Sequence, residues 1–374
     1  MQNNKSIYNL YYEWWKNIDK FIFSLIILLF TTGLFFSLVS TSLLVSDKLD
    51  TNDYAFFFKH LSFVFLGILI IFILSSISEE KLFKISPSFF LFSLISLFLV
   101  PIIGVEVNSA QRWIDLYFLP RFQPIELVKP FLIILISLIL SSEKYTNIYF
   151  KYLLSFILTL VIALLLAAQP DIGQTLLVFF SWSVLIFISG INIVFLITSI
   201  LILFLALYFV INFIPKFAYI KNRILSFFDT ETGTHNAQSE KAIESITSGG
   251  YLGKGIGEGT LKNRVPEAHT DYIISVISEE FGVIAIILIL LMFLIFIYSV
   301  FKKVYLENEE RTKLVLVGCI SLILVQAMIH IGVNIRLFPT TGMTLPFISY
   351  GGSSIISISI LSGVILNLTK RKIN

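Results

Sequence analysis

Cysteine, histidine and charge are all scarce in this chain of 374 residues. The single cysteine, Cys319, excludes an intrachain disulfide. Charged residues make up 14% and hydrophobic residues 56%, with a mean hydropathy of +0.89, which excludes an ordinary soluble domain. The net charge is only +3 and the basic residues are scattered, so we expect no nucleic-acid partner. The four histidines lack the spacing of a zinc site: His60, His235, His269 and His330.

Apolar runs long enough to cross a membrane fill most of the chain. We expect about ten transmembrane helices, near 21–44, 55–78, 87–105, 127–141, 149–168, 171–189, 191–214, 272–299, 313–334 and 353–369. The first run is too long for a signal peptide and no small-residue cleavage site follows it, so we expect it to be retained. No internal repeat is visible. The prediction is an all-α, polytopic integral membrane protein with one domain, 1–374.

Basic residues in the short loops set the expected orientation. They lie before the first span, after the second, fourth and eighth spans, and in the tail, whereas the loop at 47–53 is acidic. Both termini are therefore expected in the cytoplasm. The connection of roughly 55 residues at 215–271 then becomes one large outer loop, on the same side as 106–126 and 335–352. We expect its first half, from Lys216 to Asn236, to be mobile and its second half to hold a short helix and glycine turns.

A glycine-rich polar stretch at 249–282 runs into a long apolar helix. We expect Asp271 in the first turn of that helix, on a polar face with Ser275, Ser278, Glu279 and Gly282. The opposite face is expected to meet lipid; it carries Ile273, Val276, Ile284 and Ile287. An ionisable residue on a polar stripe at the mouth of a membrane segment is a candidate functional residue.

Two interpretations of Asp271 are open. An acid at a helix start can simply interact favourably with the helix dipole. However, Glu267 and His269 precede Asp271 and Glu279 follows it, so several titratable groups gather at one membrane mouth. The glycines that alternate over 253–259 have no preceding strand and no GK[ST] ending, so we expect neither a Rossmann site nor a P-loop.

Cationic side chains lie on the same expected face, in 108–129. Arg112 and Arg121 fall in a loop, and Glu126 and Lys129 share one helix face at i, i+3 spacing. The pair could serve only to make membrane entry tolerable. Alternatively, the cations line a site for a phosphorylated ligand. Asp171 follows a very short turn and is placed to cap a helix.

A third polar segment, 339–354, combines prolines, glycines and hydroxyls at membrane depth. Irregular backbone is tolerated there where it is buried in protein or lines a cavity. We therefore include Ser349, Gly351 and Gly352 among the candidate substrate contacts. His330, in the ninth span, is expected to be a packed, hydrogen-bonded histidine.

Five stretches, in this order, resemble the FtsW/RodA (SEDS) family of peptidoglycan glycosyltransferases: RWIDL…FQPIELVK, AAQPDIGQTLLV, AIESITSGGYLGKGIGEG, PEAHTDYIISVISEEFG and FPTTGMTLPFISYGGSS. The start EWWKNIDKF and the ending GMTLPFISYGGSS are more similar to the cell-division branch than to the elongation branch. Three positions depart from the family pattern. Gln111 replaces the first of two arginines, Ile125 replaces a serine, and Asn263 replaces an acid found in some members.

The resemblance implies that lipid II is polymerised on the outer face of the bacterial cytoplasmic (inner) membrane, at the division septum. Asp271 would be the general base on the acceptor sugar hydroxyl. Undecaprenyl pyrophosphate would leave toward Arg112, Arg121 and Lys129. Glu126, Glu267, His269 and Glu279 complete the candidate substrate-contacting set. A divalent metal ion, Mg²⁺ or Mn²⁺, would fit a pyrophosphate substrate, although its ligands are unknown.

The implied partners are a class B penicillin-binding protein transpeptidase, other divisome proteins and membrane lipid. We expect the transpeptidase to raise the rate by ordering the mobile half of the outer loop. Alternatives are a lipid II flippase, the elongation-type polymerase and a purely structural division scaffold. A flippase should show inverted repeats or broken helices in both halves of the chain.

Overall fold

The computed structural model describes residues 7–41, 55–107, 110–116, 120–214, 221, 225, 234–260, 265 and 267–370. Its helices are α1 Ile7–Asn17, α2 Lys20–Thr41, α4 Ala55–Ser76, α5 Glu79–Ile103, α6 Pro124–Leu140, α7 Ile148–Ala168, α8 Ile172–Ile188, α9 Ile193–Phe213, α11 Thr234–Gly249, α12 Ile273–Leu306, α13 Glu310–Asn334 and α14 Gly352–Leu368. Two short strands, β1 Val105–Val107 and β2 Ala110–Trp113, form an antiparallel pair. Each expected span coincides with one helix. The all-α, polytopic membrane architecture is therefore confirmed.

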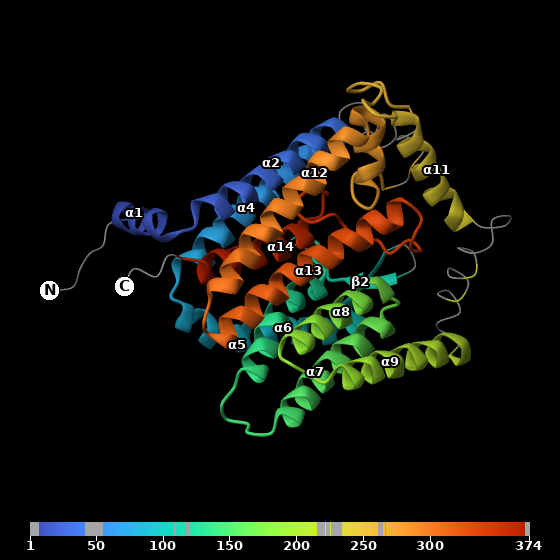
Figure 1. The fold of residues 1–374 in the computed structure, drawn as a ribbon. Coiled ribbons are helices and arrows are strands. Elements are labelled where there is room, and N and C mark those ends of the chain that lie inside the picture. Colours follow the sequence, from blue (N-terminus) through green and yellow to red (C-terminus); the bar gives the residue numbers. More distant parts are fainter. Residues whose placement is uncertain are drawn as a thin grey trace.

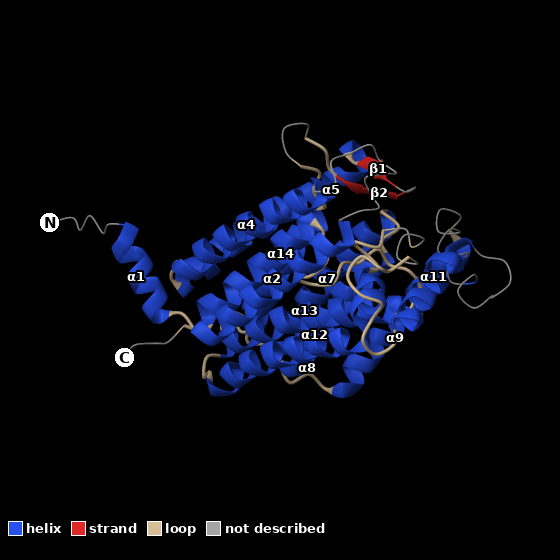
Figure 2. Ribbon diagram, turned by 90° about the horizontal axis from the view of Figure 1, so that it is seen from above, coloured by secondary structure: helices blue, strands red, loops and turns tan. Residues whose placement is uncertain are grey.

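The helices form an elongated bundle (Figure 1). In both Figures 1 and 2, α1 lies at one end, and α11 and the β1–β2 pair lie at the other. Helix α14 is buried along nearly its whole length and packs against α4, α6 and α13. Helix α9 lies at the edge of the bundle and packs mainly against α8.

Three helices at the centre of the bundle are short. Seven helices of the described chain are long and apolar enough to cross a membrane, whereas α6, α8 and α14 each have 17 residues. At 1.5 Å per residue, 17 residues span about 25 Å, less than the ~30 Å hydrocarbon core. The N-cap residues of these three helices are Gln123, Asp171 and Gly351, which are polar or have irregular backbone. These starts place polar groups inside the bundle.

Helix α5 begins eight residues before the expected start of its span at 87. Ser78 caps it by accepting a hydrogen bond from the amide of Lys81, and Glu79 and Glu80 occupy its first turn. Pro87 lies inside the helix rather than at its beginning. The prediction was wrong at this boundary because the charged first turn lies ahead of the apolar run.

Helix α12 is interrupted at Gly282, whose φ of 75° and ψ of −178° are not helical. Ile273 and Val276 are buried rather than lipid-facing, and Ile273 belongs to the main hydrophobic core of the protein. The lipid-facing prediction holds only beyond the break, where Ile284 and Ile287 are exposed.

The predicted short helix in the outer loop is confirmed as α11. The segment predicted to be mobile, from Lys216 to Asn236, lies mostly outside the described residues.

Candidate active site

The glycine loop at 249–260 docks by backbone contact against α12. A Cβ on Gly249 would overlap the carbonyl of Ser278, and one on Gly253 would overlap the carbonyl of Glu280. A Cβ on Gly282 would in turn overlap the carbonyl of Tyr251. Glycine is therefore required on both sides of this contact.

The break in α12 is sealed by hydrogen bonds to the same loop. The amide of Val283 donates to the carbonyl of Gly250 (3.0 Å), and the amides of Lys254 and Gly255 donate to the carbonyls at 279 and 280 (2.9 and 3.0 Å). The backbone groups that the interruption leaves without helical partners are thus paired, as buried backbone groups require.

Glu279 anchors this loop from within the protein. Its side chain is fully buried, and its Oε1 accepts from the Lys254 ammonium (3.0 Å) and from the Thr260 amide (2.9 Å). Its Oε2 accepts from the Ser245 hydroxyl of α11 (3.0 Å). The carboxylate therefore joins α11, α12 and the glycine loop. Contact between Glu279 and a substrate stays a prediction.

Asp271 lies in a turn over 267–272, just ahead of α12 rather than in its first turn, and Tyr272 is the N-cap. The Asp271 amide donates to the carbonyl of Glu267 (3.0 Å), and its own carbonyl accepts from the Asn334 side chain (3.0 Å). Its half-buried carboxylate faces Gly342, where a Cβ would lie 3.7 Å from Oδ2. The backbone of Asp271 is therefore fixed by α13 and the carboxylate is turned toward the segment 339–354.

His269 and Glu267 belong to the same turn. The His269 ring lies 5.2 Å from that of Phe56 and 6.0 Å from that of Tyr350, between ring centroids, and its carbonyl accepts from the Tyr350 amide (3.2 Å). Burial lowers the pKa of His269, and the nearby Glu267 carboxylate opposes that effect. Glu267 is exposed and accepts from the Thr270 hydroxyl (3.2 Å). The turn thus holds a half-buried histidine and an exposed carboxylate beside Asp271.

Lys129 occupies the centre of a buried polar network. Its ammonium donates to Glu126 (2.8 Å) and to the side-chain oxygen of Gln326 on α13 (3.3 Å), and the side chain is 0% exposed. Gln174 of α8 also donates to Glu126 (3.0 Å). The expected i, i+3 pair is therefore formed, and α8 and α13 enclose it. Direct contact between Lys129 or Glu126 and a substrate stays a prediction.

Asp171 and Arg112 form a second polar cluster, next to the one around Lys129 and Glu126. Asp171 caps α8, as expected, by accepting from the amide of Gln174 (3.3 Å). Arg112 of β2 lies 3.5 Å from its carboxylate and also donates to the carbonyls of Gln169 and Pro170. The Asp171 carboxylate is buried, and the Arg112 guanidinium is its cationic neighbour.

Arg121 lies apart from these groups. Its side chain is 58% exposed and forms an ion pair with Asp115 (2.7 Å). Of the three predicted cations, Lys129 is enclosed, Arg112 is partly exposed and Arg121 faces outward.

The segment 339–354 joins α13 to the start of α14. The amide side chain of Gln326 donates to the carbonyl of Thr344 (3.1 Å), and the Thr344 hydroxyl donates to Ser354 (2.7 Å). Ser349 is buried, and its hydroxyl accepts from the amide of Leu345 (2.9 Å). His330 contacts the carbonyl of Met343 through Nδ1 (2.7 Å), which confirms its packed, hydrogen-bonded role.

Gly351 and Gly352 are packing positions at the start of α14. A Cβ on Gly351 would lie 2.9 Å from the Thr344 side chain, and one on Gly352 would meet the ring of Phe63 at 2.5 Å. Ser349, Gly351 and Gly352 therefore stabilise the conformation of the segment 339–354. Substrate contact by these three residues stays a prediction.

The segment 339–354 lies beside both the start of α8 and Asp271. A Cβ on Gly173, in the first turn of α8, would lie 2.8 Å from Thr341. The next residue, Gly342, faces the Asp271 carboxylate. One short stretch of backbone, Thr341 and Gly342, therefore separates the Asp171 end of α8 from the candidate base.

Several polar residues of the site escaped the sequence prediction. Gln174 and Gln326 lie inside apolar helices, where a polar side chain is itself a signal of function. Gln123 donates to Asp171 (3.2 Å), and Lys254 pairs with Glu279. For Gln123 and Lys254, the sequence carries no such signal, and only their contacts with other elements show that they belong to the site.

Metal ligands do not converge in the described part of the chain, which contains no group of three or more His, Cys, Asp or Glu residues placed to hold an ion. The Glu126 carboxylate already has the Lys129 ammonium at 2.8 Å. A cation so close disfavours a second one at Glu126, so a divalent ion bound together with the pyrophosphate stays a prediction.

Comparison with known proteins gives a consistent result. The sequence matches the family of cell cycle proteins comprising FtsW, RodA and SpoVE over residues 19–374. A probable peptidoglycan glycosyltransferase FtsW from Haemophilus influenzae is 32% identical, covering 96% of this chain and 93% of the relative. The corresponding Caulobacter vibrioides protein is 30% identical, covering 96% and 91%.

Two solved structures share the fold. A chain from a peptidoglycan synthase complex, described as coordinating polymerization and crosslinking, has a TM-score of 0.77 at 26% identity and covers 94% of this chain and 97% of its own. The rod shape determining protein RodA of Thermus thermophilus has a TM-score of 0.68 at 25% identity, covering 94% and 96%. The chain therefore belongs to the FtsW/RodA/SpoVE family of cell cycle proteins.

Proposed function

We infer that the chain is a peptidoglycan glycosyltransferase of the cell-division type, which polymerises lipid II into glycan strands. The match to relatives named as FtsW over nearly the whole chain supports this function. The observation that carries the chemistry is the position of Thr341 and Gly342 between Asp271 and the start of α8, where Asp171 pairs with Arg112.

In the proposed reaction, Asp271 accepts the proton of the acceptor sugar 4-hydroxyl. The hydroxyl oxygen forms a bond to the anomeric carbon of the growing strand. The bond between that carbon and the pyrophosphate oxygen breaks, and undecaprenyl pyrophosphate leaves with the electron pair. Arg112 and Arg121, the predicted cations that reach the surface, stabilise the charge that develops on it.

Lys129 acts differently in this scheme. Because its ammonium is enclosed by Glu126 and Gln326, we assign it the task of holding α6, α8 and α13 in register behind the cations. A phosphate approaching Arg112 would compete with Asp171 for the same donor.

We place this multi-pass protein in the bacterial inner membrane, with both ends in the cytoplasm and the Asp271 mouth outside, at the septum. The positive charge of the short loops supports this orientation. A class B penicillin-binding protein is the proposed partner. The similarity to a chain of a synthase complex that couples polymerization to crosslinking supports such a partner.

The experiment is a strand-forming assay with purified protein, lipid II and the Asp271→Asn variant. We expect the rate to fall by on the order of a hundredfold or more, because the substitution is nearly isosteric and removes the base. Glu244→Gln is the matched control, since Glu244 is an exposed carboxylate on the neighbouring α11. Near-parental polymerisation by Asp271→Asn would reduce Asp271 to a structural residue of the turn.

A further inference from the structure

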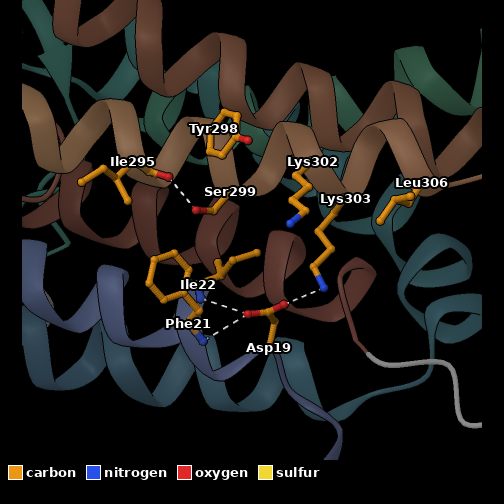
Figure 3. A pocket seen from close by; sticks show the side chains of 9 residues that line it. All are labelled: Asp19, Phe21, Ile22, Ile295, Tyr298, Ser299, Lys302, Lys303 and Leu306. Carbon is orange, nitrogen blue, oxygen red and sulfur yellow. Dashed lines mark hydrogen bonds and ion pairs between the residues drawn. The ribbon is translucent and has the colours of Figure 1, made fainter.

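A pocket lies at the far end of α12 from Asp271. Its volume is about 410 Å³, and it is formed by the start of α2 and the last turns of α12. Figure 3 shows Lys302 and Lys303 reaching from α12 toward α2 and Asp19. The glycosyl-transfer chemistry proposed above leaves this pocket without a role.

The pocket carries an excess of positive charge. Lys303 forms an ion pair with Asp19 (2.7 Å), and Asp19 also accepts hydrogen bonds from the amides of Phe21 and Ile22 (3.1 Å each). The single carboxylate of the pocket is therefore already occupied. Among the described residues, no hydrogen bond or ion pair is formed by the Lys302 ammonium, which points into the pocket (Figure 3). Two lysines against one aspartate leave one net positive charge.

The remaining walls are apolar and open to the outside of the bundle. Phe21, Ile295 and Leu306 line the pocket and are 57%, 44% and 65% exposed. The surface of α12 continues from there with exposed Leu291 and Leu288. Tyr298 also lines the pocket, and tyrosine beside lysine is typical of the membrane–water interface. A ligand with an anionic head and long apolar chains fits this combination.

We propose that this pocket binds the headgroup phosphate of an anionic phospholipid, with Lys302 contacting the phosphate and the acyl chains lying along α12. A free phosphate ion would have only one net charge to bind and would leave the apolar walls unused. Burial of acyl methylenes adds affinity that a soluble anion lacks. The pocket thus serves as a lipid site at the opposite end of the bundle from the glycan chemistry.

The experiment uses the purified full chain and native mass spectrometry to titrate phosphatidylglycerol and, separately, phosphatidylcholine. We expect preferential retention of phosphatidylglycerol, and roughly fivefold weaker binding in Lys302→Gln, the effect of one lysine near an anionic headgroup. Lys84→Gln is the matched control, because Lys84 is an exposed lysine at the same end of the bundle, on α5, and does not line the pocket. Equal losses in both variants, or no loss in Lys302→Gln, would overturn the assignment.

Two further arms separate the possible sources of the anion. Ser299→Leu fills the pocket from α12 without changing its charge, so phosphatidylglycerol binding should fall as in Lys302→Gln. Glycerol phosphate, which has the same head without chains, should not compete at concentrations where the lipid is bound. Full competition by glycerol phosphate, or unchanged lipid binding in Ser299→Leu, would show that the site does not recognise a phospholipid.

Discussion

Replacing Gly282 by alanine tests how the glycine loop holds the first part of α12, which follows the turn that carries Asp271. The backbone of Gly282 has φ 75° and ψ −178°, a region that side chains other than glycine occupy at a cost of about 1–3 kcal/mol. The new Cβ would also overlap the carbonyl of Tyr251, so the loop must move away from α12. Two backbone hydrogen bonds, from Val283 and Ile284 to the loop, would then be lost. At about 1 kcal/mol each, the total becomes about 3–5 kcal/mol.

The assay is thermal unfolding of the purified protein, followed by strand synthesis at a temperature where the variant is folded. Gly257→Ala is the matched control: it lies in the same loop at φ 83°, with nothing within 4 Å of the added Cβ. It should therefore show the backbone strain alone, about 1–2 kcal/mol. We expect Gly282→Ala to be clearly less stable and to synthesise less strand. Equal effects of the two substitutions would refute the docking argument.

Three further outcomes are expected. Lys129→Ala should destabilise the protein by about 3–5 kcal/mol, because it leaves Glu126 buried without its cation, and the double variant Glu126→Gln, Lys129→Met should recover most of that loss in a denaturation series. Glu279→Gln should cost about 1–3 kcal/mol and speed hydrogen exchange at 254–260, since it weakens charged bonds to Lys254 and the Thr260 amide. Because the pKa of His269 is lowered in the folded protein, the unfolded chain binds a proton at this histidine more readily than the folded chain does below about pH 6.5. Stability should therefore fall on acidification, and His269→Gln should flatten that fall in melting curves recorded from pH 7.5 to 5.5.

The spans could be predicted from the sequence because lipid makes a simple demand on it: about twenty apolar residues per crossing. That rule located even the short central helices, since α8 and α14 are predominantly apolar. It failed at the start of α5, where a capping serine and two acids extend the helix beyond its apolar run. It also missed the burial of Ile273 and Val276, because periodicity cannot tell a face covered by the rest of the protein from a face covered by lipid.

The candidate site could be predicted only as separate clusters. The i, i+3 spacing of Glu126 and Lys129 indicated their pairing, which the structure contains. Nothing in that spacing indicated that Gln174 and Gln326 would close over the pair, since they come from α8 and α13. The anchoring of Glu279 by Ser245 and Lys254 is likewise a contact across elements. Such contacts depend on tertiary packing, which no local pattern encodes.

The position of the break in α12 bears on the choice between polymerase and transporter. A transporter with alternating access is expected to have interrupted helices in corresponding positions of its two halves. Among the described helices, non-helical backbone angles are found inside α12 at Gly282, and the interruption is sealed by the glycine loop rather than facing a path through the bundle. An interruption held closed by backbone contacts suits a fixed scaffold that presents Asp271 at one face. That arrangement agrees with polymerisation, in which the base must stay in place while the substrate moves past it.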